Sequence, residues 1–278
     1  MLECVVNVSE GADRRLLDAL ATKAGPSLLD LHADPDHNRS VFTLAGPSVE
    51  AAVQALATFA TECIDLRSHG GVHPRLGALD VVPFVPLAGD GAPARPDDDL
   101  SEALSARRRF AQWAAAELGL PCFLYGPERS LPEVRRHAFV DLVPDTGPPH
   151  PHPSAGACAV GARPALVAYN LWLDTKDISR ARAVAAAVRR PEVRTLGLAV
   201  SEGTQVSCNL LDPWTTGPAQ VYDAVAGHAA DVGMRISRAE LVGLAPRAVV
   251  EDVPPERLAV LDLSFDRTVE ARLAASGG

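Results

Sequence analysis

The sequence has few lysines and no block of basic residues. Only two of its 26 basic residues are lysine, Lys23 and Lys176, and the arginines are spread along the chain. With 35 acidic residues, the formal net charge is -9 and the pI is near 5.4. This balance argues against a broad surface for nucleic acid or anionic membranes, although a local basic groove can still hold a small anion. We therefore expect small-molecule partners, no nucleic acid and no membrane.

Cysteine is also scarce, and its spacing is uninformative. No Cys-x-x-Cys pair occurs, and no cysteines are spaced as metal ligands, which is the pattern of a reducing compartment. The N-terminus lacks a basic segment followed by a long apolar one, and no apolar run approaches the roughly 20 residues of a membrane span. We therefore expect a cytoplasmic protein. The five cysteines are Cys4, Cys63, Cys122, Cys158 and Cys208.

Several common active-site motifs are missing as well. No Gly-x-Gly-x-x-Gly opens a helix after a strand, and no Gly-Lys-Ser/Thr occurs, so neither a dinucleotide fold nor a P-loop is indicated. Ser68 stands beside His69 without a nucleophile motif around it. His150 and His152 lie near Cys158, but this set lacks a fourth ligand at useful spacing. We predict no metal site.

The first half of the chain has a clear order of predicted elements. Apolar positions at helical spacing around Leu16–Ala21 end at Gly25-Pro26, and polar turn residues separate the next two strands. The order is β-α-β-β-α-β, which is the split βαβ or ferredoxin-like unit. The predicted strands are Leu2–Val8, Ser27–His32, Arg39–Ala45 and Leu76–Pro86, and the second helix is Val49–Leu66.

The second half repeats this order. Strands are predicted at Pro164–Leu173, Val193–Ser201, Thr204–Leu211 and Met234–Val242, with helices from an Asp174-Thr175 cap to Arg189 and over Gly217–Gly233. We predict an α+β fold of two ferredoxin-like (βαββαβ) subdomains, residues 1–163 and 164–278. Extra material between the halves includes a helix over Asp98–Leu118, a strand over Pro121–Tyr125 and an irregular Pro144–Pro153 segment. The run Leu258–Leu263 suits an edge strand or a helix.

The segment before the fourth strand carries the chemistry-bearing residues. His69 and His73 flank a pair of glycines, and Arg75 follows Pro74. Glycine lets backbone approach a ligand closely, and the ordinary imidazole pKa of roughly 6.5 suits proton transfer. Arginine suits carboxylates through paired hydrogen bonds. From these residues alone, a loop without chemistry is an equally good interpretation.

Five segments of the sequence carry a further signal: Glu3–Gly11, Asn38–Thr43, His69–Asp80, Leu124–Gly126 and Ser207–Asp212. Together they resemble the formiminotransferase domain of formimidoyltransferase-cyclodeaminase and its single-function bacterial relatives. The matches fall in register from residue 3 to about 245. The resemblance implies two ferredoxin-like subdomains with the active-site groove between them, and a homodimer.

The resemblance also implies a reaction. A formimino group passes from N-formimino-L-glutamate to N5 of tetrahydrofolate, the co-substrate, with release of glutamate and no need for a metal. The histidine that the family uses as acid and base corresponds to His73. One imidazole can serve both proton transfers through a tetrahedral intermediate. The candidate substrate-binding residues are Asn7, Ser9, His32, Asn38, Arg39, Arg75, Gly77 and Asn209.

Two departures from the family pattern leave alternatives open. His32 stands where the family has an acidic or polar residue, and it can replace or disrupt a proton-relay partner of His73. Where the family has Arg-x-Gly-Glu-aromatic-Glu, this chain reads Arg135–Val140, so Ala138 and Val140 replace two carboxylates. A related folate reaction with 5-formyltetrahydrofolate as donor, or a folate-binding protein without turnover, therefore remains an alternative.

Overall fold

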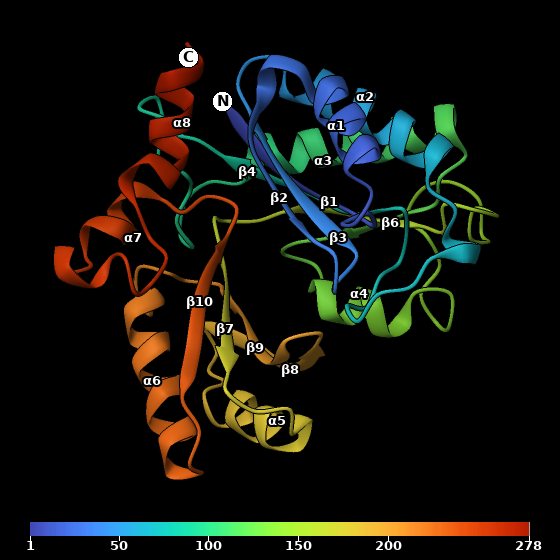
Figure 1. Cartoon of the computed structure of the whole chain (residues 1–278). Coiled ribbons are helices and arrows are strands. Elements are labelled where there is room, and N and C mark those ends of the chain that lie inside the picture. Colours follow the sequence, from blue (N-terminus) through green and yellow to red (C-terminus); the bar gives the residue numbers. More distant parts are fainter. Residues whose placement is uncertain (278) are drawn as a thin grey trace. The chain divides into compact units, whose positions relative to one another are not determined.

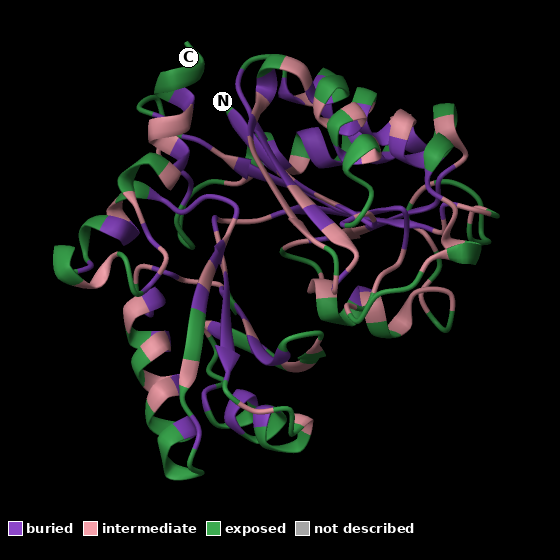
Figure 2. Ribbon diagram, viewed as in Figure 1, coloured by how far each residue is buried: buried purple, intermediate pink, exposed green. Residues whose placement is uncertain are grey.

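The computed structural model describes residues 1–277 and divides into two compact units. Unit 1 comprises Met1–Pro164 together with the end of the chain from Ala275, and unit 2 comprises Ala165–Ala274. Each unit has its own sheet and its own buried core (Figures 1 and 2). The two are therefore described separately.

The sheet of unit 1 has six strands (Figure 1). The four strands β2, β3, β1 and β4 are neighbours in that order, and every adjacent pair is antiparallel, which is the arrangement of the split βαβ unit. Two further strands, β6 and β5, continue the sheet in parallel beyond β4. The strands are β1 (Leu2–Val8), β2 (Leu28–Asp34), β3 (Arg39–Ala45), β4 (Leu79–Pro86), β5 (Cys122–Tyr125) and β6 (Cys158–Ala162).

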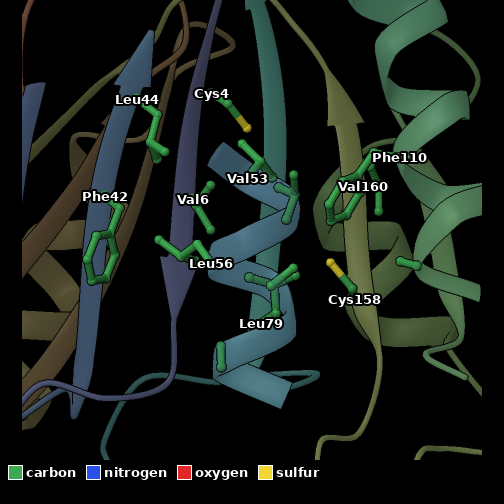
Figure 3. Close-up of a cluster of buried hydrophobic side chains, with 14 of the residues drawn as sticks. Cys4, Val6, Phe42, Leu44, Val53, Leu56, Leu79, Phe110, Cys158 and Val160 are labelled. Carbon is green, nitrogen blue, oxygen red and sulfur yellow. The ribbon is translucent and has the colours of Figure 1, made fainter. Parts of the chain in front are cut away.

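Three long helices cover one face of this sheet, and a short helix packs on the other. Helices α1 (Arg14–Ala24), α2 (Val49–Cys63) and α3 (Ser101–Leu118) share a buried core with alternate strand residues. Figure 3 shows the part of this core in which α2 and α3 contribute Val53, Leu56 and Phe110. Helix α4 (Leu131–His137) contributes Val134 to a second cluster with Val81 and Phe123, on the opposite face. Burial of both faces at β4 explains why that strand is an almost continuous apolar run.

Local signals start and stop these helices. The Asp13 side chain accepts the backbone N–H groups of Arg15 and Leu16 and caps α1, and Gly25, at φ 59°, ends it. Helix α4 begins with a capping box: the Ser130 N–H donates to the Glu133 carboxylate at 2.6 Å, and the Glu133 N–H donates to the Ser130 hydroxyl. This cap fixes where α4 begins.

Unit 2 repeats the same topology in smaller form. Its strands lie in the order β10, β7, β9, β8, with all neighbours antiparallel. Helices α5 and α6 pack on one face against alternate residues of these strands. The elements are β7 (Val167–Leu173), α5 (Ile178–Ala187), β8 (Val193–Val200), β9 (Gly203–Leu210), α6 (Pro218–Asp231), β10 (Ile236–Val242), α7 (Arg247–Glu251) and α8 (Val269–Ser276).

The predicted α+β fold and the βαββαβ order of both halves are confirmed, but some elements differ. The run Leu258–Leu263 forms neither a strand nor a helix. It forms turns, and Leu261 and Leu263 are buried in the core of unit 2. Helix α5 begins later than predicted, because Asp177 rather than Asp174-Thr175 caps it. Helix α4 and strand β6 were not predicted, since both are short and lie among proline-rich turns.

Small differences at other helix ends have simple causes. Helix α2 ends at Cys63, and a separate 3-10 turn, Leu66–Ser68, follows it. Helix α3 begins at Ser101 rather than Asp98, with the Asp99 carboxylate accepting the Ser101 N–H at 3.0 Å. The other 3-10 turns are Gly25–Ser27, Pro255–Arg257 and Phe265–Arg267.

Candidate functional site

A β-bulge aims one buried carboxylate away from the helices of unit 1. Asn7 of β1 pairs with Val81 of β4, but the next residue, Val8, pairs with Leu79, so Asp80 is an extra residue in the ladder. Leu79 and Val82 both belong to the core under the helices, whereas Val81 belongs to the opposite cluster. Asp80 therefore shares the face of Val81, although strict alternation would turn it toward the helices.

Two arginines hold the Asp80 carboxylate. Arg39 of β3 and Arg135 of α4 both donate to Oδ2, Arg135 at 2.7 Å, and the Leu76 N–H donates to Oδ1. Asp80 is fully buried, and burial alone would raise its pKa, but these donors outweigh burial and hold the pKa well below its usual range. Arg39 also donates to Oδ1 of Asn7 at 2.7 and 3.1 Å. Two cations thus face one anion.

The loop that bears His69 and His73 is tied down by Arg75. The Arg75 guanidinium donates to the backbone carbonyls of His37, Asn38 and His73 at 2.9 to 3.1 Å, and to the His69 ring at 2.7 Å. Through these contacts, Arg75 fixes the loop to the turn before β3. Burial and the Arg75 charge lower the pKa of His69.

Asn38 joins three segments at the same place. Its Oδ1 accepts the Gly11 N–H, and its Nδ2 donates to the Gly70 carbonyl, both at 2.9 Å. Asn38 has a φ of 44°, in the left-handed region that asparagine tolerates better than most residues. The residue type is therefore explained both by its backbone and by its bonds.

The ring of His73 lies within this framework. Its Nδ1 is 2.7 Å from the Pro74 carbonyl oxygen. A carbonyl can only accept, so Nδ1 carries the proton and Nε2 is left with a free lone pair. Burial, Arg39 and Arg135 lower the pKa of His73 to about 3. At neutral pH the ring is a neutral imidazole with Nε2 ready to accept a proton.

A second histidine ring accompanies it. His37 is 6% exposed, its ring centroid lies 5.8 Å from that of His73, and its Nε2 has no hydrogen-bond partner among residues 1–277. Its backbone is fixed by an N–H bond to Asp34 and by the Arg75 bond to its carbonyl. His37 thus forms one wall beside His73.

The remaining candidate residues lie in different places. Ser9 is buried and donates to the Gly77 carbonyl at 2.7 Å, which anchors the start of the loop between β1 and α1. A Cβ at Gly77 would lie 2.0 Å from the Ala157 carbonyl oxygen, so only glycine fits there. His32 lies on β2 opposite Val41. Asn209 belongs to β9 in unit 2, where it is exposed.

Two family models cover most of this sequence. The formiminotransferase domain, N-terminal subdomain, matches residues 1–163, and the formiminotransferase domain matches residues 168–254. The chain belongs to the formiminotransferase family. Each family model matches one of the two ferredoxin-like repeats, and the first contains His73, Asp80, Arg39 and Arg135.

Curated relatives match more than nine tenths of this chain. A glutamate formimidoyltransferase of Streptococcus pyogenes serotype M1 is 34% identical, with 97% of both chains covered. One from Thermoplasma acidophilum is also 34% identical, over 91% of this chain and 90% of that protein. A formimidoyltransferase-cyclodeaminase of Rattus norvegicus is 35% identical over 91% of this chain but only 51% of its own length. The chain spans about half of such two-function relatives.

The departures from the formiminotransferase pattern lie at the end of α4. Ala138 packs against the cluster of Val81 and Phe123, while Val140 is 82% exposed. Between them Phe139 has a φ of 60° and packs edge-on against Phe123 at 5.0 Å. Neither Ala138 nor Val140 carries a charge. These two positions therefore supply no carboxylate that could neutralise the arginines beside Asp80.

Three residues of the site were missed by the sequence reasoning: Asp80, Arg135 and His37, the last of which stood only among turn residues. Asp80 is the only charged residue in the apolar run Leu79–Pro86. A lone carboxylate in a buried strand needs a cation as its partner, so this pattern could have indicated a buried ion pair. Arg135 was noted only as part of a divergent segment. Its contact with Asp80 depends on α4, a seven-residue helix whose Ser130–Glu133 capping box was the signal available in the sequence.

Within residues 1–277, no group of three or more His, Cys, Asp or Glu side chains is arranged to hold a metal ion. In the same part of the chain, no helix is long and apolar enough to cross a membrane.

Proposed function

We propose that this chain is a glutamate formimidoyltransferase, which transfers the formimino group of N-formimino-L-glutamate to N5 of tetrahydrofolate and releases L-glutamate. The observation that carries the proposal is a neutral His73 with a free Nε2 beside an excess of positive charge. Names of relatives that match 90% or more of both chains support the same activity.

His73 would manage the two protons of the reaction. N5 attacks the amidine carbon, and Nε2 of His73 takes the N5 proton as the new C–N bond forms. The tetrahedral intermediate then collapses as the bond to the glutamate nitrogen breaks, and that nitrogen receives the proton from the imidazolium.

Arg39 and Arg135 would attract the acidic substrate. Together they carry two positive charges against the single charge of Asp80, so the site has a net attraction for a carboxylate. A bound carboxylate would also raise the pKa of His73, because it offsets the two cations that lower it. Substrate binding thereby makes His73 a stronger base when N5 must lose its proton.

A turnover assay tests the proposal. Purified protein with formiminoglutamate and tetrahydrofolate should release glutamate, measured with glutamate dehydrogenase, and the release should require both substrates. Loss of glutamate from a mixture of the protein, 5-formyltetrahydrofolate and glutamate, measured with the same coupling enzyme, tests the alternative donor, which the loss of carboxylates at Ala138 and Val140 favours. Binding of 5-formyltetrahydrofolate without any turnover would instead identify a folate-binding protein.

The assembly is a separate proposal. We propose a homodimer, as the family resemblance implies, and a cytoplasmic location, as the cysteine pattern favours. Sedimentation equilibrium should give twice the chain mass of 29.2 kDa. A mass of one chain at micromolar concentration would refute this.

A further inference from the structure

The turn between β2 and β3 holds a histidine ring inside unit 1. Residues of such turns are usually exposed, as Pro35 is, but His37 is buried. The His37 N–H donates to the Asp34 carboxylate, and the His37 carbonyl accepts a hydrogen bond from Arg75, both at 2.9 Å. These bonds fix the backbone that carries the ring.

The loop that bears His73 lies directly against this turn. The Val72 N–H donates to the Asp36 carbonyl at 3.2 Å. A Cβ at Gly71 would collide with the His37 carbonyl oxygen, so glycine is needed for the loop to come this close. The approach places the His37 and His73 rings with their centroids 5.8 Å apart. Both rings therefore belong to one site.

The His37 ring has a polar atom without a partner. Its Nε2 is buried and makes no hydrogen bond to any residue in the described part of the chain. By contrast, His69, His73 and His137 each have a ring nitrogen 2.7 Å from a polar partner. A buried nitrogen with no partner destabilises the free protein, whereas an apolar ring of similar shape would not. The unmet Nε2 beside His73 therefore indicates a ligand atom.

We propose that His37 hydrogen-bonds the formimino group of the donor through Nε2 and favours a formimino donor over a formyl donor. The amidine of formiminoglutamate is a strong base that carries a proton at neutral pH, so its nitrogens present N–H donors. A neutral imidazole presents one lone pair that can accept such a donor. This inference rests on the proposed function and names a residue that recognises the transferred group.

The charges around His73 make a neutral acceptor useful there. Arg39 and Arg135 attract the carboxylates of the donor, but they repel its cationic amidine. A neutral Nε2 binds the amidine without adding a third positive charge. A formyl group has an uncharged carbonyl oxygen in place of this N–H, and hydrogen bonds to charged groups are roughly twice as strong as those between neutral groups. Loss of the His37 contact should therefore weaken the formimino compound more.

The test uses His37→Phe, which keeps a flat ring but removes both nitrogens. In the glutamate-release assay, kcat/KM for formiminoglutamate should fall about tenfold or more. The Ki of N-formyl-L-glutamate, used as a competitive inhibitor, should change less than about threefold. The unfolding midpoint of the variant should stay the same or rise by a few degrees, because an unmet polar atom is removed.

Two further variants separate recognition from packing. His37→Gln returns an acceptor but not the ring, and it should recover most of the kcat/KM that His37→Phe loses. His150→Phe, at an exposed histidine, should change neither constant. The inference is overturned if His37→Phe leaves kcat/KM unchanged, or if His37→Gln is no better than His37→Phe. An equal loss for both compounds, together with a lower unfolding midpoint, would also overturn it, because His37 would then be structural.

Nuclear magnetic resonance of the ring nitrogens gives a measurement that does not depend on a substitution in the binding step. Saturating formiminoglutamate should shift the Nε2 resonance of His37 in the unmodified protein, and saturating N-formyl-L-glutamate should shift it less. The resonance is assigned by its absence from His37→Gln. An Nε2 resonance that does not move in an enzyme that turns over formiminoglutamate would refute the contact. Absence of turnover in the unmodified protein would instead refute the proposed function.

Discussion

The proton on Nδ1 of His73 is fixed by the Pro74 carbonyl, so only Nε2 can accept a proton from a substrate. His73→Ala should lower turnover by about two orders of magnitude or more, because a general acid and base is lost, and should leave the Kd for folate within a few-fold. Steady-state rates and calorimetry measure both. The control is His150→Ala, at an exposed histidine. An active His73→Ala enzyme would move the role to His32 or His69.

Arg135 acts on His73 through its charge as well as through Asp80. In Arg135→Met the pKa of His73 should rise above about 3, since one of the two cations that lower it is removed. The KM for formiminoglutamate should also rise. Nuclear magnetic resonance titration of the His73 ring measures the pKa. The exposed neighbour Arg136→Met is the matched control, and equal behaviour of the two variants would argue against an Arg135 role.

At the scale of elements, the β4 bulge and the tight entry to that strand aim Asp80 at its arginines. Gly77→Ala forces a methyl group against the Ala155 and Ala157 carbonyls. The variant should lose about 1–3 kcal/mol of unfolding free energy. It should also lose most of its activity, because Leu76 and Asp80 shift together. Urea unfolding and turnover measure this.

Gly89→Ala provides the comparison for that element. No atom lies within 4 Å of a Cβ built at Gly89, so this change should alter stability by less than about 0.5 kcal/mol. If Gly77→Ala behaves like Gly89→Ala, the close packing at the entry to β4 does not limit the site.

At the scale of the whole molecule, the buried site makes stability depend on pH. The pKa of His73 lies near 3 in the folded chain and at roughly 6.5 in an unfolded one, so the unfolded state binds more protons between these values. The pKa of Asp80 is also lowered on folding, so its contribution is present above about pH 4 and is lost as pH falls further. Stability should therefore fall steadily from pH 6.5 toward pH 3.

Thermal unfolding followed by circular dichroism checks this slope. His73→Gln should flatten the fall of the unfolding midpoint between pH 6.5 and 4, because the group that binds the extra proton in the unfolded state is gone. His228→Gln, at an exposed histidine of α6, controls for the loss of any one histidine. Identical profiles for the two variants would show that His73 is not the group responsible.

Local patterns were enough to predict most elements. Alternating or continuous apolar runs, together with Gly25-Pro26 and similar stops, correctly indicated both βαββαβ repeats. They failed for the two short elements α4 and β6. The start of α4 depends on its Ser130–Glu133 cap, and β6 is recognisable only through its pairing with β4 and β5. The run Leu258–Leu263 is apolar because it packs into the core of unit 2. Hydrophobicity alone does not indicate which backbone conformation such a run adopts.

The two-repeat fold, the family and the histidine loop follow from the amino-acid sequence, since they depend on residue types and spacings within short segments. The three-dimensional fold is needed to bring Asp80, Arg39 and Arg135 together, because they come from β4, β3 and α4 and a single bulge turns Asp80 toward the other two. It also decided that His73 is neutral with Nε2 free, since that state is set by burial, by two distant charges and by one backbone carbonyl.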